Sequence, residues 1–370
     1  MEIKNNYNEC LTNLACSIRK YFGLDYNHNT IDYIDKILEE KKPKNVITIL
    51  FDGMGANILK RTLPENAFFI RNMVKPITSV FPPTTVAATT SVITGLNPCE
   101  TGMLGWNSYY KELDKVITTF LHCAKDDSFH KPIEEARKYK DAHMITKPIM
   151  DEINEKGIDK GYHISPHGDI KYANLDDMLA KILDLTNEPD KKYIYAYDPE
   201  PDSTMHDFGP DSEKARALIE ERNAKVEEFS NKLKDSIVFV IADHGHVKVD
   251  NILLKDYPEI RECLKRNTSI EQRAVNFFVK EDKKEKFVEL FNKEFSEFFD
   301  LYPMEEVIES KLFGDGNENL IFRDELGDFL AVAKSNKTLL SDGDNFLYSQ
   351  HAGNTDDEIY IPLIVLYKEK

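Results

Sequence analysis

The sequence is poor in cysteine and has no closely spaced cysteine pair. It holds five cysteines among 370 residues, an odd and widely separated set: Cys10, Cys16, Cys99, Cys123 and Cys263. Disulfide-rich secreted proteins instead use even sets of cysteines at short spacings. This usage therefore predicts a protein of a reducing compartment.

Long apolar runs are also missing. No apolar segment approaches the roughly 18 residues that a membrane-spanning helix needs. The opening residues, 1–9, lack the basic stretch followed by an apolar one that a secretory leader would show. We therefore expect a cytoplasmic protein without a membrane anchor.

Basic residues are in the minority. The chain has 48 lysines and arginines against 65 aspartates and glutamates, which gives a formal net charge of −17. A nucleic-acid surface depends on clustered positive charge, so this balance argues against one. Part of the acidic excess can be metal-binding carboxylate, whose charge a bound dication would partly neutralise.

What the sequence does contain is a recurring α/β pattern. Val46–Phe51, Tyr193–Tyr197 and Ile237–Ile241 are apolar runs typical of strands buried on both faces of a parallel sheet. Helical patterns lie between them, and Ile359–Leu366 predicts a last strand. A chain of this length can bury a large core, so we predict one α/β domain or two unequal parts.

The other segments are assigned around this core. Residues 1–42 show amphipathic periodicity and predict a helical preface. Residues 266–340, between two site-bearing strands, predict a small α+β cap of strand, helix and strand. Residues 107–175 are expected to be an excursion from the sheet. The predicted core is therefore 1–265 together with 341–370.

The segment Ser79–Gly95 reads S-V-F-P-P-T-T-V-A-A-T-T-S-V-I-T-G. Proline suits only the first turn of a helix and glycine favours a left-handed end, so a helix should begin near Thr84 or Thr85 and stop at the glycine. Its β-branched residues have poor helix propensity, so burial must hold it. Hydroxyls at such a helix start favour an alkoxide and an incoming phosphate, although capping alone would also explain them.

Four strand ends each carry a carboxylate or an imidazole. Because open α/β sheets bind ligands at the carboxyl ends of their strands, we expect these side chains to converge on one edge. The candidates beside Thr85 are Asp52, Asp202, His206, Asp243, His244 and His351. Three carboxylates and three imidazoles suit two cations with mixed ligands and an open position. Two cations can hold an attacking alkoxide, here from Thr85, beside a phosphoryl oxygen.

These motifs, in this order, resemble the alkaline phosphatase superfamily, and most closely its nucleotide pyrophosphatase/phosphodiesterase branch. The resemblance runs from about Val46 to Leu366. The matching segments are Asp52-Gly53, Phe81-Pro82-x-x-Thr85, Thr94-Gly95-Leu96-x-Pro98, Glu200-Pro201-Asp202-x-x-x-His206-x-x-Gly209-Pro210, Ala242-Asp243-His244-Gly245 and His351.

The resemblance implies a doubly wound, mostly parallel sheet flanked by helices, as in alkaline phosphatase. It also implies two divalent metal sites, with zinc as the expected ion and manganese as an alternative. The implied ligands of one metal are Asp202, His206 and His351. Those of the other are Asp52, Asp243, His244 and the nucleophile Thr85.

The chain departs from the family pattern at several positions. Thr84 stands before the nucleophile, Thr101 stands where the family has a histidine, and Ala352 separates the last histidine from its glycine. The family's phosphodiesterases place an asparagine later in the chain as a second phosphate donor. Asn107 matches it only if one residue is inserted, and otherwise caps a loop. These departures leave the choice of substrate open.

Three further residues are considered for the substrate site. Trp106 and Tyr109 can stack on a nucleobase near the nucleophile, although a packed hydrophobic loop explains them equally well. His246 follows a predicted ligand by two positions and can orient a ligand from behind.

The predicted reaction is metal-dependent hydrolysis of a small phosphoester. The Thr85 alkoxide attacks phosphorus to give a phosphothreonine, while backbone N–H groups and Asn107 hold the phosphoryl oxygens. A phosphodiester or pyrophosphate, such as a nucleotide derivative, is the leading substrate class. A phosphomonoester or phosphonate is the near alternative, and a metal-binding or partner-binding domain without activity is the alternative of another class. The oligomeric state is not indicated.

Overall fold

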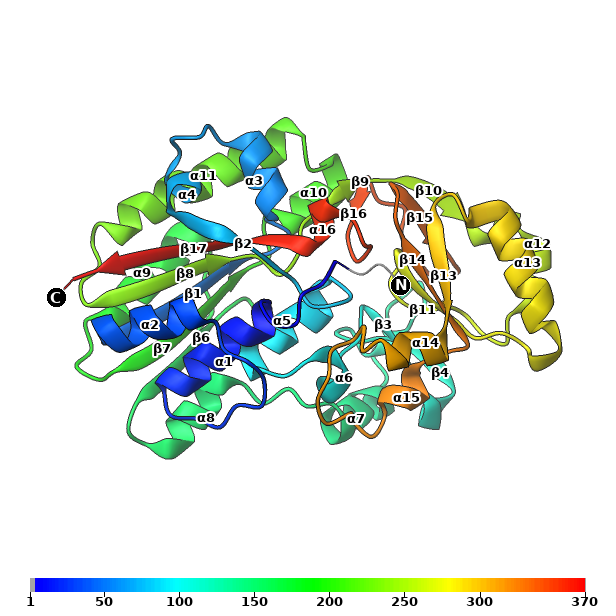
Figure 1. Cartoon of the computed structure of the whole chain (residues 1–370), viewed down its shortest axis with the longest axis horizontal. Coiled ribbons are helices and arrows are strands. Elements are labelled where there is room, and N and C mark those ends of the chain that lie inside the picture. Colours follow the sequence, from blue (N-terminus) through cyan, green and yellow to red (C-terminus); the bar gives the residue numbers. More distant parts are fainter. Residues whose placement is uncertain (1–3, 370) are drawn as a thin grey trace.

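The computed structural model describes residues 4–369, which form two main sheets lying side by side along the long axis of the molecule (Figure 1). The larger sheet contains β1 (Asn45–Phe51), β2 (Met73–Thr78), β6 (Lys160–Ile164), β7 (Lys192–Asp198), β8 (Ser236–Ile241) and β17 (Tyr360–Lys368). Its strand order is β2-β17-β8-β1-β7-β6.

The direction of the strands explains where the site forms. β8, β1, β7 and β6 pair in parallel, whereas β17 runs antiparallel to both of its neighbours. The first residue of β17 therefore lies at the same edge as the last residues of β1, β7 and β8. For this reason His351, which precedes β17, meets side chains that follow the other strands. The predicted α/β sheet is confirmed, with one antiparallel strand in it.

Helices cover both faces of this sheet, as predicted (Figure 1). The helices of one face are α1 (Leu11–Tyr21), α2 (Asp32–Lys41), α5 (Thr85–Thr94) and α8 (Ile149–Lys156). Those of the other are α3 (Ala56–Thr62), α4 (Phe68–Asn72), α9 (Leu175–Thr186) and α11 (Glu213–Ser230). The predicted helical preface is α1 with α2. Within residues 4–369, no helix combines the length and apolarity that crossing a bilayer requires.

Helix α5 begins and ends where the prolines and the glycine predict. Thr84 is its N-cap, and the glycine after it has a φ of 76°. The hydroxyls of Thr89, Thr90 and Thr94 each donate to the carbonyl oxygen four residues earlier, at 2.6 to 2.7 Å. These bonds satisfy the polar groups of a helix that is largely buried, so a threonine-rich sequence can hold this position.

The second sheet combines two distant parts of the chain. Its strands, in spatial order, are β13 (Phe299–Pro303), β14 (Phe329–Ala333), β12 (Ala274–Phe277), β11 (Ser269–Ile270), β3 (Asn107–Tyr110), β4 (Lys115–Thr118) and β5 (Cys123–Ala124). The helices around it are α12 (Pro258–Cys263), α13 (Lys284–Phe295), α14 (Met304–Glu309) and α15 (Phe322–Glu325). The strand, helix and strand expected in the cap are present as β12, α13 and β14. This sheet contains strands from both sides of residue 266, so the strands alone do not mark a domain boundary there. The predicted division at residue 266 therefore stays a prediction.

Shorter elements connect these layers. They are α6 (Pro98–Thr101), α7 (Glu134–His143), α10 (Asp202–Phe208), α16 (Asp356–Ile359), β9 (Val247–Lys248), β10 (Asp250–Leu253), β15 (Lys337–Leu340) and β16 (Ser349–Gln350). Three single-turn 3-10 helices cover Lys111–Leu113, Leu254–Asp256 and Glu281–Lys283.

The expectation that residues 107–175 leave the sheet is wrong for their last part. Strand β6 pairs in parallel with β7 along its whole length. Its sequence, K-G-Y-H-I, lacks a continuous apolar run because it is an edge strand with partly exposed side chains. An edge strand of this kind gives little signal in the sequence.

Candidate metal centre and substrate cavity

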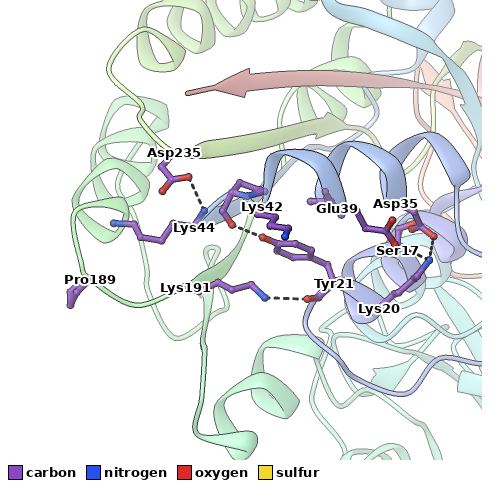
Figure 2. Close-up of a pocket in the computed structure, with 12 residues that line it drawn as sticks. Ser17, Lys20, Tyr21, Asp35, Glu39, Lys42, Lys44, Pro189, Lys191 and Asp235 are labelled. Carbon is purple, nitrogen blue, oxygen red and sulfur yellow. Dashed lines mark hydrogen bonds and ion pairs between the residues drawn. The ribbon is translucent and has the colours of Figure 1, made fainter. Parts of the chain in front are cut away.

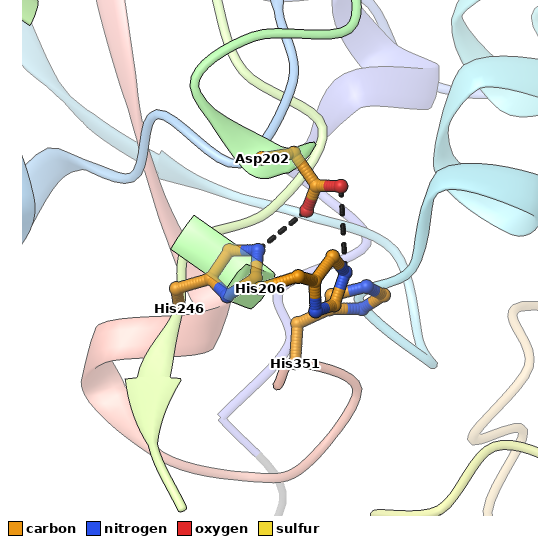
Figure 3. Close-up of side chains that lie close together, drawn as sticks. All are labelled: Asp202, His206, His246 and His351. Carbon is orange, nitrogen blue, oxygen red and sulfur yellow. Dashed lines mark hydrogen bonds and ion pairs between the residues drawn. The ribbon is translucent and has the colours of Figure 1, made fainter. Parts of the chain in front are cut away.

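The predicted ligands lie in two groups at the carboxyl edge of the larger sheet. Within each group, one ligand atom from every residue lies within 4.8 Å of the others. One group is Asp52, Asp243 and His244, and the other, drawn in Figure 3, is Asp202, His206, His246 and His351. The structure thus brings together the two sets that the resemblance implies, and adds His246 to the second.

Three of the histidines are held from behind through Nδ1, each by a backbone carbonyl oxygen. The pairs are His244 with Gly245 at 3.1 Å, His206 with Ser349 at 2.9 Å, and His351 with Pro83 at 3.2 Å. A proton on Nδ1 satisfies that contact and leaves the Nε2 lone pair free. These contacts orient the three rings so that Nε2 of each faces the ligand group.

His246 is held differently. Its Nε2 lies 2.5 Å from Asp202 Oδ1 and its Nδ1 lies 3.0 Å from Ser349 Oγ. Burial lowers the pKa of His246 to about 4, so the ring is neutral near pH 7. Since both of its nitrogens are already engaged, His246 is suited to orienting the Asp202 carboxylate (Figure 3).

The group around Asp52 has the character of a cation site. Tyr197 donates a hydrogen bond of 2.5 Å to Asp52 Oδ2, and the Gly53 N–H donates to Asp243 Oδ1 at 3.0 Å. Asp243 Oδ2 is buried without a hydrogen-bond partner in residues 4–369. Burial, followed by neighbouring carboxylates, raises the pKa of both Asp52 and Asp243 well above the ordinary value. A divalent cation would satisfy the unpaired oxygen and offset the crowded negative charge.

Thr85 stands at the edge of this group, in the first position of α5. Its Oγ1 lies 3.2 Å from His244 Nε2 and 3.4 Å from both Asp52 carboxylate oxygens. The first N–H groups of a helix have no partner within the helix, so unpaired donors surround this hydroxyl. The arrangement can hold an anion beside a nucleophilic oxygen.

A cavity of about 260 Å³ opens beside Thr85, and its lining combines residues of α5 and α10 with residues of the second sheet. Asn107, on β3, lines it, and its Oδ1 accepts a hydrogen bond from Thr118 Oγ1 at 3.0 Å. Asn107 Nδ2 donates to no residue among those described, and is available to a ligand. Trp106 is also part of the lining, is 38% exposed, and packs edge-on against Phe120 at 6.1 Å.

Tyr109 is not brought to this cavity. Its ring packs on Phe278 at 5.0 Å between centroids, and the guanidinium of Arg266 lies 4.0 Å from the ring centroid. Alternate residues of a strand face opposite sides of a sheet, so Tyr109 shares the face of Asn107. It lies farther along β3, over a different cluster of side chains.

Several residues at the site were missed in the sequence. Tyr197 ends the run Tyr193–Tyr197 at the edge where the ligands gather, and this position is a signal that could have found it. Glu271 and Lys125 line the cavity from distant segments, and their sequence surroundings carry no comparable signal.

A larger hollow, of about 930 Å³, lies at the opposite edge of the strands (Figure 2). Several of its charged groups are engaged with one another or with backbone: Lys20 Nζ lies 2.7 Å from Asp35 Oδ2, and Lys191 Nζ donates to the Tyr21 carbonyl oxygen at 3.1 Å. None of the predicted site residues lines it. The smaller cavity, which Thr85, Asp202, His206 and His351 line, is therefore the candidate site.

Comparison with known proteins gives a consistent result. Residues 46–348 match the family model described as type I phosphodiesterase / nucleotide pyrophosphatase. An uncharacterized pyrophosphatase/phosphodiesterase of Schizosaccharomyces pombe is 25% identical over 215 residues, which cover 54% of this chain and 44% of that protein. The matched region thus spans less than half the length of this relative.

Solved structures share the fold. Murine ectonucleotide pyrophosphatase/phosphodiesterase 5 superimposes with a TM-score of 0.66 at 21% identity, covering 88% of each chain. An inactive threonine-to-alanine variant of the murine protein in complex with AMP gives a TM-score of 0.64 at 21% identity, covering 86% of this chain and 87% of that one. The human protein gives 0.64 at 20% identity, with the same coverage. The family match includes every candidate metal ligand except His351, and it shows that the chain belongs to the type I phosphodiesterase / nucleotide pyrophosphatase family.

Proposed function

We propose that this protein is a divalent-metal-dependent phosphodiesterase or nucleotide pyrophosphatase with Thr85 as its nucleophile. The observation that carries the proposal is the position of Thr85 Oγ1, within 3.4 Å of Asp52 and His244 at the start of α5. An inactive murine relative carrying a threonine-to-alanine change supports a catalytic threonine in this fold.

The proposed metal ligands are the two groups described above. Asp52, Asp243 and His244 would hold one cation next to Thr85, and Asp202, His206 and His351 would hold the other. Mixed carboxylate and imidazole donors suit zinc best, with manganese as the alternative. When bound, such cations supply positive charge that lowers the pKa of the threonine hydroxyl and offsets charge on the phosphoryl oxygens.

The chain's own residues account for the remaining chemistry. Thr85 Oγ1 forms a bond to phosphorus as the bond to the leaving oxygen breaks, and the hydroxyl proton ends on the departing alcohol of a diester or the departing phosphate of a pyrophosphate. Water then cleaves the phosphothreonine, which returns the hydroxyl and releases the phosphate product. The N–H groups that begin α5 and Asn107 Nδ2 would hold the phosphoryl oxygens.

The lining of the cavity favours a diester or pyrophosphate over a monoester. Lys125 is the one lysine or arginine among the described lining residues. Its ammonium group already lies 3.0 Å from Asp344 Oδ2 and 2.9 Å from Ser341 Oγ. A neutral amide and an occupied lysine suit the single charge of a phosphodiester better than a doubly charged terminal phosphate. A phosphomonoesterase or phosphonate hydrolase is the alternative that the same metal site allows.

The test compares zinc-loaded wild-type protein with Thr85→Ala on bis-p-nitrophenyl phosphate and p-nitrophenyl phosphate. We expect a higher kcat/KM on the diester and loss of turnover in the variant, because the covalent step needs the hydroxyl. Bound zinc should be unchanged in the variant, since the carboxylates and imidazoles remain. Full activity of Thr85→Ala would refute the nucleophile, and a monoester preference would refute the substrate class.

We also propose a small-molecule phosphoester or nucleotide as the partner, and a cytoplasmic location. The five cysteines support the location, because all of them are buried free thiols. Cell fractionation with compartment markers tests it, and recovery outside the cytoplasmic fraction would contradict it.

A further inference from the structure

The turn between β11 and β12 reaches from the second sheet to the reaction centre. Its residues Glu271, Gln272 and Arg273 are 6%, 9% and 0% exposed. Strand β11 pairs with β3 through Ile270 and Asn107, which places this turn against the proposed phosphate donor. Three consecutive polar side chains are thus buried at one place.

Gln272 and Arg273 each contact the chain close to a proposed metal ligand. Gln272 Oε1 accepts from Gln350, the residue before His351, at 3.3 Å. Arg273 forms two bonds, of 2.6 and 2.8 Å, with the carboxylate of Glu358. Glu358 Oε1 also accepts from the N–H of Gly353, two residues after His351, at 2.7 Å. The turn is therefore fixed to the loops that carry the metal ligands.

Glu271 contacts the other side of the site. A single oxygen, Oε1, accepts hydrogen bonds from Thr84 Oγ1 at 2.6 Å and from the Trp106 N–H at 2.7 Å. Thr84 precedes the nucleophile Thr85, and Trp106 precedes Asn107. One carboxylate oxygen therefore joins the start of α5 to the start of β3, the two elements that carry the proposed nucleophile and phosphate donor.

Burying the Glu271 carboxyl group lowers the stability of the folded protein unless its contacts compensate. It is almost fully buried and forms no ion pair with any residue in the range 4–369. Burial raises the pKa of Glu271 to about 7. A buried acid without a cationic partner costs stability that an apolar side chain of similar size would not. Stability alone therefore does not explain a glutamate at this position. A role in fixing the position of α5 relative to β3 does explain it.

We propose that Glu271 is a positioning residue that sets the separation between the Thr85 hydroxyl and the Asn107 amide. The proposal rests on the proposed function, since it concerns the reaction of Thr85. Glu271 acts through Thr84 and Trp106 and makes no contact with the reacting atoms. Its loss should leave both cations and the fold in place but misalign the nucleophile with the groups that hold the phosphoryl oxygens.

The experiment measures kcat and KM on bis-p-nitrophenyl phosphate for two variants. The bound zinc and the Tm of each variant are measured as well. Glu271→Leu removes the acceptor, and we expect kcat to fall roughly 10- to 100-fold, as for the loss of two buried hydrogen bonds, with little change in KM. Glu271→Gln keeps an acceptor oxygen in the same place, and its kcat should stay within about threefold of wild type. General destabilisation would not lower kcat in Glu271→Leu, spare it in Glu271→Gln, and leave KM and bound zinc unchanged in both variants.

A double-mutant cycle tests the route through Thr84. Thr84→Val removes one donor, and its effect should not add to that of Glu271→Leu if the two act together. The matched control is Glu325→Leu, the same substitution at a buried glutamate of the second sheet region that lies away from the cavity. It should leave kcat unchanged.

The results distinguish the positioning role of Glu271 from the proposed role of Thr85 as nucleophile. Wild-type kcat in Glu271→Leu, additive effects with Thr84→Val, or a loss of kcat matched by loss of bound zinc overturns this inference while an inactive Thr85→Ala still supports the nucleophile. Full activity of Thr85→Ala overturns the proposed function and this inference with it.

Discussion

At the scale of single residues, the orientation of Asn107 decides what it can offer a substrate. Its Oδ1 accepts from Thr118 Oγ1 at 3.0 Å, which leaves Nδ2 as the group that this cavity-lining residue can offer to a ligand. An amide rotated by half a turn would present an oxygen to an anionic substrate instead of a donor. Thr118 is therefore a residue on which the proposed phosphate contact depends.

Thr118→Val should lower kcat/KM by roughly tenfold, the worth of one buried hydrogen bond, because the Asn107 amide loses the contact that fixes it. Asn107→Ala should cost more, about 100-fold or above, as for loss of a donor to a developing oxyanion. Both are measured on bis-p-nitrophenyl phosphate. Thr118→Ser is the control, since it keeps the hydroxyl and should stay near wild type. Unchanged activity in Thr118→Val, with Asn107→Ala impaired, would contradict the orientation argument.

The residues that could be predicted are those fixed by local sequence. Asp52 and Asp243 follow apolar strands directly, and the ends of parallel strands share an edge, so their meeting follows from order alone. Glu271 could not be predicted, because its place depends on the pairing of Ile270 with Asn107 across a large sequence separation. The sequence also gives no information about the surroundings of β3, so it cannot indicate that the Tyr109 ring packs on Phe278.

At the scale of elements, α5 is held at its end by two other helices. Arg19 of α1 donates to the carbonyl oxygen of Thr94 at 2.9 Å and pairs with Glu152 of α8 at 2.8 Å. A Cβ on Gly95 would lie 2.7 Å from Arg19 Cδ, and the φ of this glycine is +76°. Any side chain here must both adopt a left-handed backbone and displace the arginine.

Gly95→Ala should therefore destabilise the protein by more than the roughly 1–2 kcal/mol of a left-handed alanine alone. Gly157, after α8, is the matched control: its φ is +70° and nothing lies within 4 Å of its added Cβ. The free energy of unfolding from urea denaturation is compared for Gly95→Ala and Gly157→Ala. Equal losses would show that the contact with Arg19 carries no weight.

Elements were predictable where burial made their pattern uniform. The apolar runs of β1 and β8 and the proline and glycine limits of α5 gave the right positions, because each signal is local. The edge strand β6 gave no such run, and the second sheet joins segments 107–124 and 269–333, a pairing that no local pattern encodes.

At the scale of the whole molecule, one buried acid should shape how stability varies with pH. Glu325 is 1% exposed, and neither of its carboxyl oxygens has a hydrogen-bond partner among the described residues. Burial, with a smaller contribution from Asp324, raises the pKa of Glu325 well above its ordinary value of 4.5. The native protein therefore keeps this proton at a pH where the unfolded chain has lost it.

The direction of this pH dependence follows from the number of protons that the native and the unfolded chain bind. Below the ordinary pKa, native and unfolded chains both carry the proton and Glu325 imposes no pH-dependent cost. As the pH rises above that value, the unfolded chain binds fewer protons than the native one, so stability falls by about 1.4 kcal/mol per pH unit until the native pKa is reached. Replacing the acid with a neutral side chain of the same shape should remove this slope.

Glu325→Gln should therefore gain free energy of unfolding relative to wild type as the pH rises from about 5 to 8, with the two proteins converging near the lower limit. Urea denaturation across this range measures it. The control is Glu289→Gln on the exposed face of α13, which should change stability little and equally at every pH. A difference between Glu325→Gln and wild type that stays constant at all pH values would contradict this prediction. It would mean that the pKa of Glu325 is the same in the native and the unfolded protein.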